Sequence, residues 1–578
     1  HVCRYFWDSK LLTRKYPERI KKKIISLRDE LIYTEKEVKE NYLSTRDYVE
    51  ELIDIVGKLY ERLDEYKNIN DLYDYSDIFA MALKIVKEHE DIRKQISDYF
   101  FEIMIDEYQD TNDLQDYFIS LIAHDNVYMV GDIKQSIYRF RNANPDIFQQ
   151  KYAEYKTEAS SNEVIDLLQN FRSRTEVVDS INKIFGRLMD NEVGGADYRK
   201  EHEMRFGQKE YVNGKSDYDM EILTYAYDRK SYPFNTDPAF NKDEVEAFIV
   251  AQDIKKKIAN GFEVYDFDLK KLRGATYSDF CILMSKSKNF DLFKKILTHN
   301  RIPVRIEQDE EIKGSDLMTV IKNIFRLLDG YRKQDEEVIR YNFISVARSF
   351  LMEMPDSEIY DVVTNGRIDS TDLMKKIMLI SENIEGKTIT DLLDEIIDRF
   401  EVYDRMARIG ELNDNLVRVN YLYQWAHNLN TLDYSYMEFV EYLDHIFDDE
   451  RKLQVGLNKP DIDAVKILTI HKSKGLQYHV CYFPQLDSRF NDDDLKKAVT
   501  CDPEFGIITP CFIADRGSMD TVARKLYKAK YYSENRSEQI RLFYVALTRT
   551  MEKIILVMPD KDNDYGEEGI LPAYIRTS

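Results

Sequence analysis

The chain has 578 residues, of which 43% are hydrophobic and 33% charged, and its formal net charge at pH 7 is −23. This length is enough for roughly four domains, and the composition is ordinary for a globular protein. No apolar run is long enough to span a membrane and the first residues lack the layout of a signal peptide, so we expect no membrane association. The five cysteines form no C-x-x-C or Cys/His cluster. They predict a reducing cytoplasm and argue against a structural zinc or iron–sulfur site.

The strong negative charge, taken alone, argues against nucleic acid as a partner. Several basic residues are nevertheless concentrated in a few short stretches of the chain. They are Lys134, Arg139, Arg141, Arg172, Arg174, His471, Lys472 and Lys474. A local basic track on an acidic body is compatible with a groove for single-stranded DNA.

Residues 1–70 have the polar composition and apolar spacing of long helices. Tyr48, Leu52 and Leu59 recur on one helical face, which we expect to pack into a core. A second amphipathic helix is predicted over Tyr73–Val86. We assign 1–70 to a helical accessory region with no chemistry of its own.

The next segment has the pattern of a strand, a helix and a second strand. The apolar run Ile103–Ile105 is followed by helical spacing over 114–121 and by a second apolar run, Val127–Val130. Such a unit predicts a parallel sheet covered by helices, whose ligands bind at the carboxyl ends of the strands. The polar residues expected at that edge are Asp106, Glu107, Asp132 and Gln135.

An acid pair that directly follows a buried strand suits nucleotide hydrolysis. The first carboxylate, Asp106, can hold the Mg²⁺ that bridges two phosphates, and the second, Glu107, can orient or deprotonate the attacking water. A solvated Asp-Glu pair is the commoner alternative, and a metal nuclease that uses the same acids is a further one. Gln135 and two arginines downstream favour phosphoryl transfer from a nucleotide over the nuclease.

One of these arginines, Arg172, follows an apolar run at Val164–Leu168 that predicts a strand. Ser173 and Glu176 have the spacing of a capping box for the next helix. Arg172 is therefore expected at a strand-to-helix junction on the ligand edge of a sheet. The alternative is an arginine that pairs with an acid at the start of a helix.

The region 311–455 is almost wholly helical by its apolar spacing, and it contains Gly386-Lys387-Thr388. These three residues resemble the end of the phosphate-binding motif G-x-x-x-x-G-K-[ST], which follows a strand. Ser381 stands where that motif has its first glycine, and the preceding segment has a helical pattern. We therefore reject the segment as a phosphate cradle.

Near the end of the chain an apolar strand, Val465–Ile470, leads into His471-Lys472-Ser473-Lys474-Gly475. A later helix ends at Thr548-Arg549 and is followed by another strand, Ile554–Met558. A lone arginine at a helix C-terminus is usually a favourable charge on the helix dipole. An arginine finger is the alternative.

Taken together, these stretches resemble the motifs of the UvrD/Rep-like superfamily 1 DNA helicases. DEYQDTN (106–112) and GDIKQSIYRFR (131–141) resemble motifs II and III, and NFRS (170–173) resembles motif IV. TIHKSKGLQY (469–478) resembles motif V, and EQIRLFYVALTRT (538–550) resembles motif VI. The form with KQSIYRFR is most similar to the AddA type of helicase/nuclease, with the RecB type next.

The resemblance implies an α/β fold with two RecA-like, P-loop NTPase-type domains, the first incomplete, and large helical insertions. Residues 71–160 would be the remainder of the first domain. Residues 161–310 and 456–578 would be the two parts of the second domain, with the helical insertion at 311–455 between them.

The activity implied is that of an ATP-dependent 3′-to-5′ DNA helicase that acts in double-strand break repair and recombination. ATP and Mg²⁺ would be its cofactors. Its partners would be single-stranded and double-stranded DNA and a second, AddB-like helicase/nuclease chain.

The resemblance also assigns roles to individual residues. Asp106 would hold Mg²⁺ and Glu107 would be the general base, while Gln135, Arg172 and Arg549 would sense the γ-phosphate. Gly475 and Gln477 would lie at the nucleotide, although the family usually has Glu where this chain has Gln477, an amide that lacks the charge. Single-stranded DNA would contact Tyr138, Phe140, Arg141 and His471. Core packing is the competing role for Tyr138 and Phe140.

Two parts of the AddA type have no counterpart in this sequence. No G-x-x-x-x-G-K-[ST] loop precedes Asp106, and no nuclease-type Asp…Asp-x-Lys constellation follows the last motif. We therefore expect an internal piece of a longer protein that does not hydrolyse ATP by itself. The alternative is a non-catalytic module that binds DNA or a partner chain.

Overall fold

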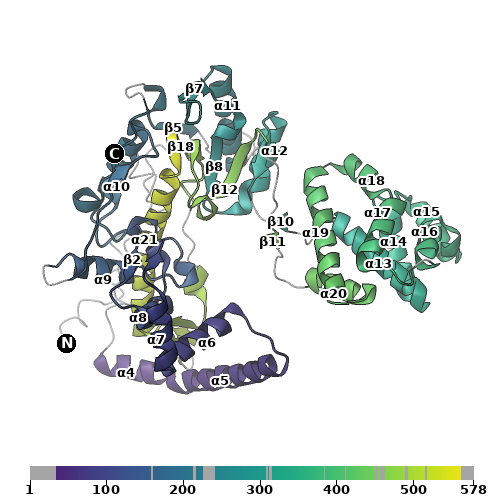
Figure 1. Ribbon diagram of the computed structural model, residues 1–578, viewed down its shortest axis with the longest axis horizontal. Helices are drawn as coiled ribbons and strands as arrows, with labels where there is room; N and C mark the ends of the chain where they lie inside the picture. The colour runs from purple at the N-terminus through teal and green to yellow at the C-terminus, as the bar shows by residue number, and fades with distance from the viewer. Residues whose placement is uncertain are drawn as a thin grey trace, which may run out of the picture. The chain divides into compact units, whose positions relative to one another are not determined.

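The computed structural model describes residues 34–157, 161–211, 216–225, 241–307, 310–311, 316–382, 384–410, 412–448, 454–455, 462–488, 493–513 and 517–560. The chain forms two compact units (Figure 1). One unit contains residues 1–305 and 464–578, and the other contains 306–463. The first unit holds a six-stranded sheet with helices around it, which confirms the predicted α/β class. No helix in these described ranges is long and apolar enough to cross a membrane.

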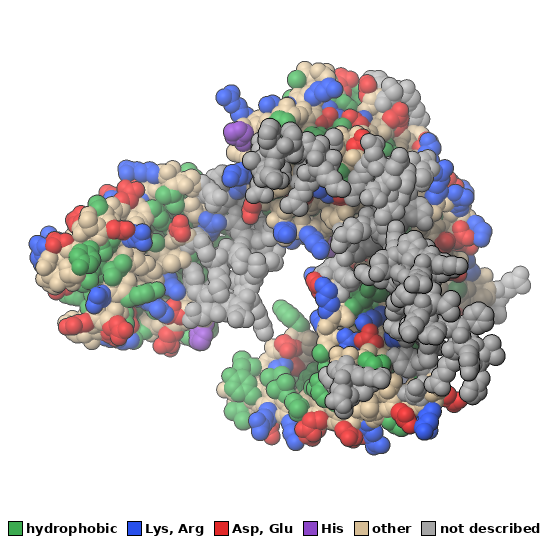
Figure 2. Space-filling model, turned by 180° about the vertical axis from the view of Figure 1, so that it is seen from behind, with side chains coloured by type: hydrophobic (Ala, Val, Ile, Leu, Met, Phe, Trp, Pro, Cys, Tyr) green, Lys and Arg blue, Asp and Glu red, His purple; other side chains and the backbone are tan. Residues whose placement is uncertain are grey.

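The first described helices are α4 (Glu35–Leu43), α5 (Arg46–Ile69), α6 (Tyr75–Glu88) and α7 (Glu90–Tyr99). The expectation for residues 1–33 lies outside the described residues. The core role expected for the apolar face of α5 is wrong, because the described elements leave that face open to water and Leu59 is 63% exposed. Figure 2 shows hydrophobic side chains gathered on the surface formed by α5 and α6.

The predicted strand–helix–strand unit is present. Strands β1 (Ile103–Ile105) and β2 (Val127–Met129) pair in parallel, with α8 (Asp113–Ile122) between them in the chain. Asn112 caps α8 by accepting a hydrogen bond from the Gln115 amide at 2.9 Å. Two 3₁₀ turns, η2 (Ile133–Gln135) and η3 (Arg139–Arg141), and then α9 (Pro145–Tyr155), follow β2.

The six-stranded sheet is the centre of the first unit, and its strand order is β5-β18-β13-β8-β12-β9. In that order the strands are Glu221–Tyr225, Thr550–Pro559, Tyr478–Phe483, Phe280–Met284, Val465–Thr469 and Val304–Ile306. The neighbouring strands from β5 to β12 run parallel. The strands expected over 465–470 and 554–558 are therefore present as β12 and β18 of one sheet. Their continuous apolar sequences suit a sheet that is covered on both faces.

Helices cover both faces of this sheet (Figure 1). On one face, α10 (Thr175–Leu188) and α21 (Val522–Leu547) pack against alternate strand residues such as Cys481 and Ile554. The next residue along β13, Tyr482, points to the opposite face. Its hydroxyl donates a 2.7 Å hydrogen bond to Asp253 of α11 (Lys242–Ala259). Helix α12 (Phe290–His299) packs against α11.

The strand expected over Val164–Leu168 is wrong. The strand in this region is β3 (Gln169–Asn170), which pairs with β4 (Arg205–Phe206) and lies outside the six-stranded sheet. The carboxylate of Asp166 accepts a hydrogen bond from Tyr152 of α9, so the apolar run is tied to that helix instead. Leu167 is consequently 82% exposed.

The capping box expected at the start of α10 is also wrong. Arg174 is the N-cap residue of α10 and makes no side-chain capping bond. The hydroxyl of Ser173 donates instead to the carbonyl of Thr550 at 2.8 Å. A tertiary contact has therefore replaced the local one that the sequence spacing favoured.

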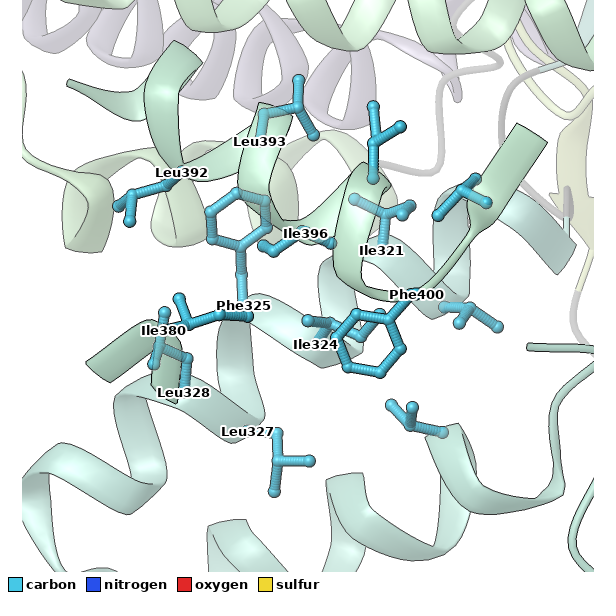
Figure 3. Close-up of a cluster of buried hydrophobic side chains, with 14 of the residues drawn as sticks. Ile321, Ile324, Phe325, Leu327, Leu328, Ile380, Leu392, Leu393, Ile396 and Phe400 are labelled. Atoms are coloured by element: carbon cyan, nitrogen blue, oxygen red, sulfur yellow. The ribbon is translucent and has the colours of Figure 1, made fainter. Parts of the chain in front are cut away.

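The second unit consists mainly of helices. They are α13 (Asp316–Lys333), α14 (Glu336–Arg348), α15 (Asp356–Thr364), α16 (Asp372–Glu382), α17 (Ile389–Arg399), α18 (Val402–Ile409), α19 (Leu412–Thr431) and α20 (Tyr436–Asp448). Their apolar faces form one core, in which Ile321 and Phe325 of α13 approach Leu392 and Ile396 of α17 (Figure 3). The Phe325 ring also packs edge-on against Phe439, with centroids 5.3 Å apart.

The segment Gly386-Lys387-Thr388 joins two helices of this unit, α16 and α17. Thr388 is the N-cap of α17 and accepts a hydrogen bond from the Asp391 amide at 3.2 Å. The Lys387 ammonium pairs with Glu395 at 2.5 Å. Because this turn follows a helix and its lysine is engaged, the rejection of a phosphate-binding loop is confirmed.

Candidate active site and nucleic-acid interface

The acid pair lies at the carboxyl end of β1, and both of its side chains are exposed. Asp106 Oδ1 accepts a 2.8 Å hydrogen bond from the backbone amide of Glu107. Glu107 itself has φ 51° and ψ 41°, a left-handed conformation that costs a residue with a side chain roughly 1–2 kcal/mol. This bend turns the chain out of the strand and into the 3₁₀ turn η1 (Tyr108–Asp110).

A buried amide that was not predicted from the sequence, Gln109, fixes the second acid. Its Nε2 donates to Glu107 Oε2 at 2.5 Å, and its Oε1 accepts from the Asp132 amide at 2.9 Å. A Cβ on Gly131 would lie 2.5 Å from this same Oε1, so a larger residue at 131 would displace the Gln109 side chain. Gln109 therefore links the segment after β1 to the segment after β2.

Gln135 is held in one orientation by groups on both sides. Its Nε2 donates to Asp132 Oδ2 at 3.0 Å, and its Oε1 accepts from Arg549 Nη2 at 3.4 Å. Burial by itself would raise the pKa of Asp132, but the Lys134 ammonium 2.6 Å away and two further hydrogen bonds hold that pKa below its usual value. Asp132 is consequently a carboxylate that can hold the Gln135 amide.

Arg549 follows the C-terminus of α21 and is only 2% exposed. Its Nε donates to the Val545 carbonyl at 3.0 Å, and its Nη2 donates to Thr548 Oγ1 at 3.1 Å. Burial, and next the positive charge of Arg172, lower the pKa of Arg549 to about 10. The side chain therefore remains a cation at neutral pH, in a position where an anion would be favoured.

Arg172 lies between β3 and α10 and is half-buried. Its backbone is fixed at both ends, since its amide donates to Asn170 at 2.9 Å and its carbonyl accepts from the Tyr211 hydroxyl at 3.3 Å. Its guanidinium makes no hydrogen bond to any residue that the structure describes, and burial lowers its pKa. Arg172 and Arg549 thus bring two cations to one partly dehydrated place.

Lys474 is a second residue whose role at the site the sequence did not reveal. Its side chain is 7% exposed, and its ammonium pairs with Asp110, lies 3.3 Å from Glu107 Oε2 and donates to the Gln135 carbonyl at 3.1 Å. It also lies 5.1 Å from the centre of the Tyr138 ring. From the sequence alone, Lys474 is expected only as one of the basic residues of a possible DNA groove.

The two other residues predicted at the nucleotide are placed at the surface. Gly475 has φ 83° with open space around its Cα, which accounts for glycine at that bend. Gln477 is exposed, and its side chain makes no hydrogen bond to a described residue. The structure does not bring either of them into contact with the acid pair.

The four residues predicted to contact DNA lie together. The ring of Phe140 is 5.8 Å from that of Tyr138 and 5.4 Å from that of His471, and the Arg141 guanidinium lies 5.2 Å from the Tyr138 ring. Phe140 is 65% exposed, which excludes core packing for it, whereas Tyr138 is half-buried. Burial lowers the pKa of His471, so its ring is a neutral stacking surface at pH 7.

Several of the basic residues predicted to line a DNA groove are paired with acidic side chains instead. Within the described ranges, Lys134 pairs with Asp132, Arg139 with Glu534, Arg174 with Glu552 and Lys474 with Asp110. These cations hold the structure together. Arg141 lies 5.7 Å from the centre of the exposed Phe140 ring and 5.2 Å from that of the half-buried Tyr138 ring.

Asp106 is the residue predicted to hold Mg²⁺. No group of three or more His, Cys, Asp and Glu side chains in the described part of the chain has a metal-binding arrangement. The exposed carboxylate of Asp106 fits a hydrated Mg²⁺, because that ion keeps several waters and is usually shared between one or two carboxylates and substrate phosphates.

Comparison with known proteins places the chain among the helicases that its motifs resemble. Residues 7–156 match the UvrD/REP helicase N-terminal domain, and 383–560 match the UvrD-like helicase C-terminal domain. The chain is 29% identical to the A-type subunit of the ATP-dependent helicase/nuclease of Clostridium kluyveri, over 94% of its own length and 48% of the relative's. It is also 29% identical to the corresponding proteins from Bacillus cereus and Bacillus anthracis, over 95% of the chain and 48% of each relative.

The chain thus spans about half the length of the curated relatives that it matches. The two matched domains between them cover more than half of the chain and include the segments around Asp106 and Arg549. The chain belongs to the UvrD/REP-like helicase family, and it is similar there to helicase/nuclease subunits of the AddA type.

Proposed function

We propose that the chain supplies most of the motor of an ATP-dependent DNA helicase, as part of a helicase/nuclease subunit of the A type. The observation that carries this proposal is the meeting of the segments that follow β1, β2 and β12 with the C-terminal end of α21. Lys474 reaches Glu107 from one of them, and Arg549 reaches Gln135 from another. An acid pair that lies near an arginine and its amide partner suits phosphoryl transfer from a nucleotide.

In this proposal ATP binds with its γ-phosphate between the acid pair and the two arginines. Asp106 would hold a hydrated Mg²⁺, an ion that would supply positive charge to neutralise the phosphates. Glu107, oriented by Gln109, positions the attacking water and accepts its proton. Arg172 and Arg549 stabilise the charge that develops on the transferred group.

The DNA substrate is a single strand that passes over Tyr138, Phe140, Arg141 and His471. Stacking on aromatic side chains tolerates any sequence, because every base has a π-face. Lys474 lies between this aromatic cluster and Glu107, so a change at the DNA can reach the base. We propose translocation in the 3′-to-5′ direction.

The direction of movement can be measured by streptavidin displacement from biotinylated oligonucleotides. The chain, extended upstream to include a phosphate-binding loop, should clear streptavidin faster from a 5′-terminal biotin than from a 3′-terminal one. The opposite order would overturn the polarity without affecting the helicase assignment. A Glu107→Gln variant provides the control, because it should lose displacement from both ends.

We further propose that the enzyme works in the cytoplasm in double-strand break repair and recombination. Its relatives are named as one subunit of a helicase/nuclease, which supports assembly with a second, AddB-like chain. Co-expression with candidate partner chains, followed by size-exclusion chromatography, tests the assembly directly.

The competing function is a non-catalytic module that binds DNA or a partner. The 578 residues contain no G-x-x-x-x-G-K-[ST] loop after a strand, and this favours a chain that is inactive alone. ATP hydrolysis by the chain extended upstream distinguishes the two functions. A helicase motor should hydrolyse ATP in that extended chain, and a non-catalytic module should not.

A further inference from the structure

Two short segments that carry the proposed phosphate-sensing arginines lie side by side. Directly after Arg172, the Ser173 hydroxyl donates to the Thr550 carbonyl at 2.8 Å, and the Arg174 amide donates to the Met551 carbonyl at 2.8 Å. Thr550 and Met551 directly follow Arg549. We call residues 173–174 and 550–552 together the clasp.

The clasp ends in a buried ion pair. Arg174 Nη1 lies 3.0 Å from Glu552 Oε2, and the two residues are 2% and 0% exposed. The guanidinium of Arg174 lies over the ring of Tyr218, 3.7 Å from its centre, and 4.9 Å from the centre of the Tyr211 ring. These aromatic faces stabilise a cation that has lost its water.

The other oxygen of Glu552 is also engaged. Its Oε1 accepts from the Tyr265 amide at 2.7 Å and from His479 Nδ1 at 2.9 Å. The pair therefore has partners on both sides and joins α10, β18, β13 and β6 (Glu263–Asp266). A buried ion pair of this kind generally adds little net stability compared with an apolar pair of the same size. The main effect of the Arg174–Glu552 pair is then to fix the position of α10 relative to β18.

The clasp opposes a specific repulsion. Arg172 and Arg549 are cations close enough for the charge of one to disfavour the charge of the other. Without a bound anion they would move apart, because like charges in a partly dehydrated place repel strongly. Arg172 is separated from Arg174 by one residue and Arg549 from Glu552 by two, so the ion pair can resist this movement directly.

We propose that Arg174 and Glu552 are positioning residues, which hold Arg172 and Arg549 at the separation needed to receive one phosphate group. This inference rests on the proposed function. It adds that the spacing of the two sensing arginines is set in advance by a buried pair which does not itself touch the nucleotide. Preorganised charges of this kind need no rearrangement when the reaction occurs.

Three variants separate positioning from mere stabilisation. Glu552→Gln keeps the acceptor for Tyr265 and His479 but leaves the buried Arg174 cation with Glu176, 3.6 Å away, as its remaining acidic partner among the described residues. Arg174→Met leaves the Glu552 anion without its cation. The double variant Arg174→Met/Glu552→Gln contains neither charge of the pair, so it should recover part of the stability that each single change loses; Glu176, which lies 3.6 Å from Arg174, still loses its cation.

The spacing is measured by pulsed electron spin resonance between labels at Phe171→Cys and Leu476→Cys, with Cys3 and Cys501 replaced by serine. Phe171 and Leu476 are exposed, Phe171 precedes Arg172, and the Leu476 carbonyl accepts from Arg549 Nη1 at 3.5 Å. We expect one narrow distance in the unsubstituted clasp. All three variants, including the double variant, should lose this narrow distribution.

Turnover is then measured in the chain extended upstream, with saturating single-stranded DNA. A displacement of ~1 Å can cost about 100-fold in rate, so kcat should fall between tenfold and 100-fold in all three variants. The KM for ATP should change much less. A double variant that regains both stability and full kcat would show that the pair only stabilises the fold, and would overturn the proposal.

The label distance tests the clasp, and turnover tests the proposed helicase function, so the failure of one can be told from the failure of the other. A distance distribution that narrows only with the intact pair supports the clasp even if the extended chain hydrolyses no ATP, and the helicase proposal alone then fails. An unchanged distribution in every variant overturns the clasp whatever the turnover is.

Discussion

The ammonium of Lys474 lies 3.3 Å from Oε2 of Glu107, so the residue proposed as general base is held by a lysine from the segment that follows β12. The same ammonium pairs with Asp110 and lies over the Tyr138 ring. Lys474 thus contacts both the acid pair and the proposed DNA track. A strand of DNA that moved Tyr138 would also change the surroundings of Glu107.

Replacing Lys474 by methionine should destabilise the first unit. Burial raises the pKa of Asp110, and Lys474 opposes that effect, so the variant leaves a mostly buried acid without its cation. We expect a loss of about 2 kcal/mol in the free energy of unfolding, less than for a fully buried pair because some solvent remains. Urea denaturation measures it, and the exposed neighbour Lys472→Met is the matched control. Equal losses for the two variants would contradict the assigned role of Lys474.

A buried acid away from the site should make stability depend on pH. Glu246 of α11 is fully buried, and burial, reinforced by Asp487 and Asp243, raises its pKa to about 7. Its Oε1 accepts from the Gln485 amide at 3.0 Å, whereas its Oε2 has no hydrogen-bond partner in the described ranges. Because the folded pKa is above the unfolded one, the group's stabilising contribution is complete below about pH 4.5 and is lost as the pH rises through 7.

Glu246→Gln removes this titration while keeping the acceptor for Gln485. Compared with the variant, the unsubstituted chain should lose up to about 3 kcal/mol of unfolding free energy between pH 4.5 and pH 9. Urea titrations at several pH values give the difference. Parallel curves for the two proteins would show that Glu246 is not protonated near neutrality.

Single-stranded DNA should bind locally and electrostatically despite the acidic total charge. We expect affinity to fall steeply with salt, and Phe140→Ala and Arg141→Ala each to weaken binding by about tenfold, as stacking contributes ~1–3 kcal/mol per base. Fluorescence anisotropy with a labelled oligonucleotide measures both effects. Phe248→Ala, an exposed phenylalanine on α11, should leave binding unchanged. An affinity that does not change with salt or in the Phe140→Ala and Arg141→Ala variants would exclude the aromatic cluster as the DNA site.

Local sequence pattern predicted much of the fold. The strands over 103–105, 127–129, 465–469 and 550–559, and the helix beginning at Asp113, form where apolar runs and helical spacing indicated them. The strand expected over 164–168 and the capping box expected at Ser173 are wrong because residues remote in the chain bind these segments. Asp166 is held by α9, and Ser173 is held by Thr550, more than 370 positions away in the chain.

The candidate site was predicted less completely, for a related reason. Asp106 and Arg549 are recognisable because each ends a regular element. Gln109, Lys474 and Glu552 act through contacts with residues remote in the chain, and their burial cannot be read from residue type. Polar residues inside an amphipathic or charged stretch are normally solvated, so nothing in the local pattern distinguishes these three.

The central claim is that these residues form most of an ATP-hydrolysing site whose phosphate-binding loop lies outside the 578 residues. Such a loop supplies backbone N–H groups and a lysine to the β- and γ-phosphates, and without those phosphates Asp106 would hold Mg²⁺ only weakly. The most direct test is steady-state ATPase with saturating single-stranded DNA, on this chain and on one extended upstream to include the loop. We predict DNA-stimulated turnover in the extended chain only, abolished by Glu107→Gln. Turnover by the short chain that is lost in Glu107→Gln, or an extended chain that stays inactive, would contradict the account.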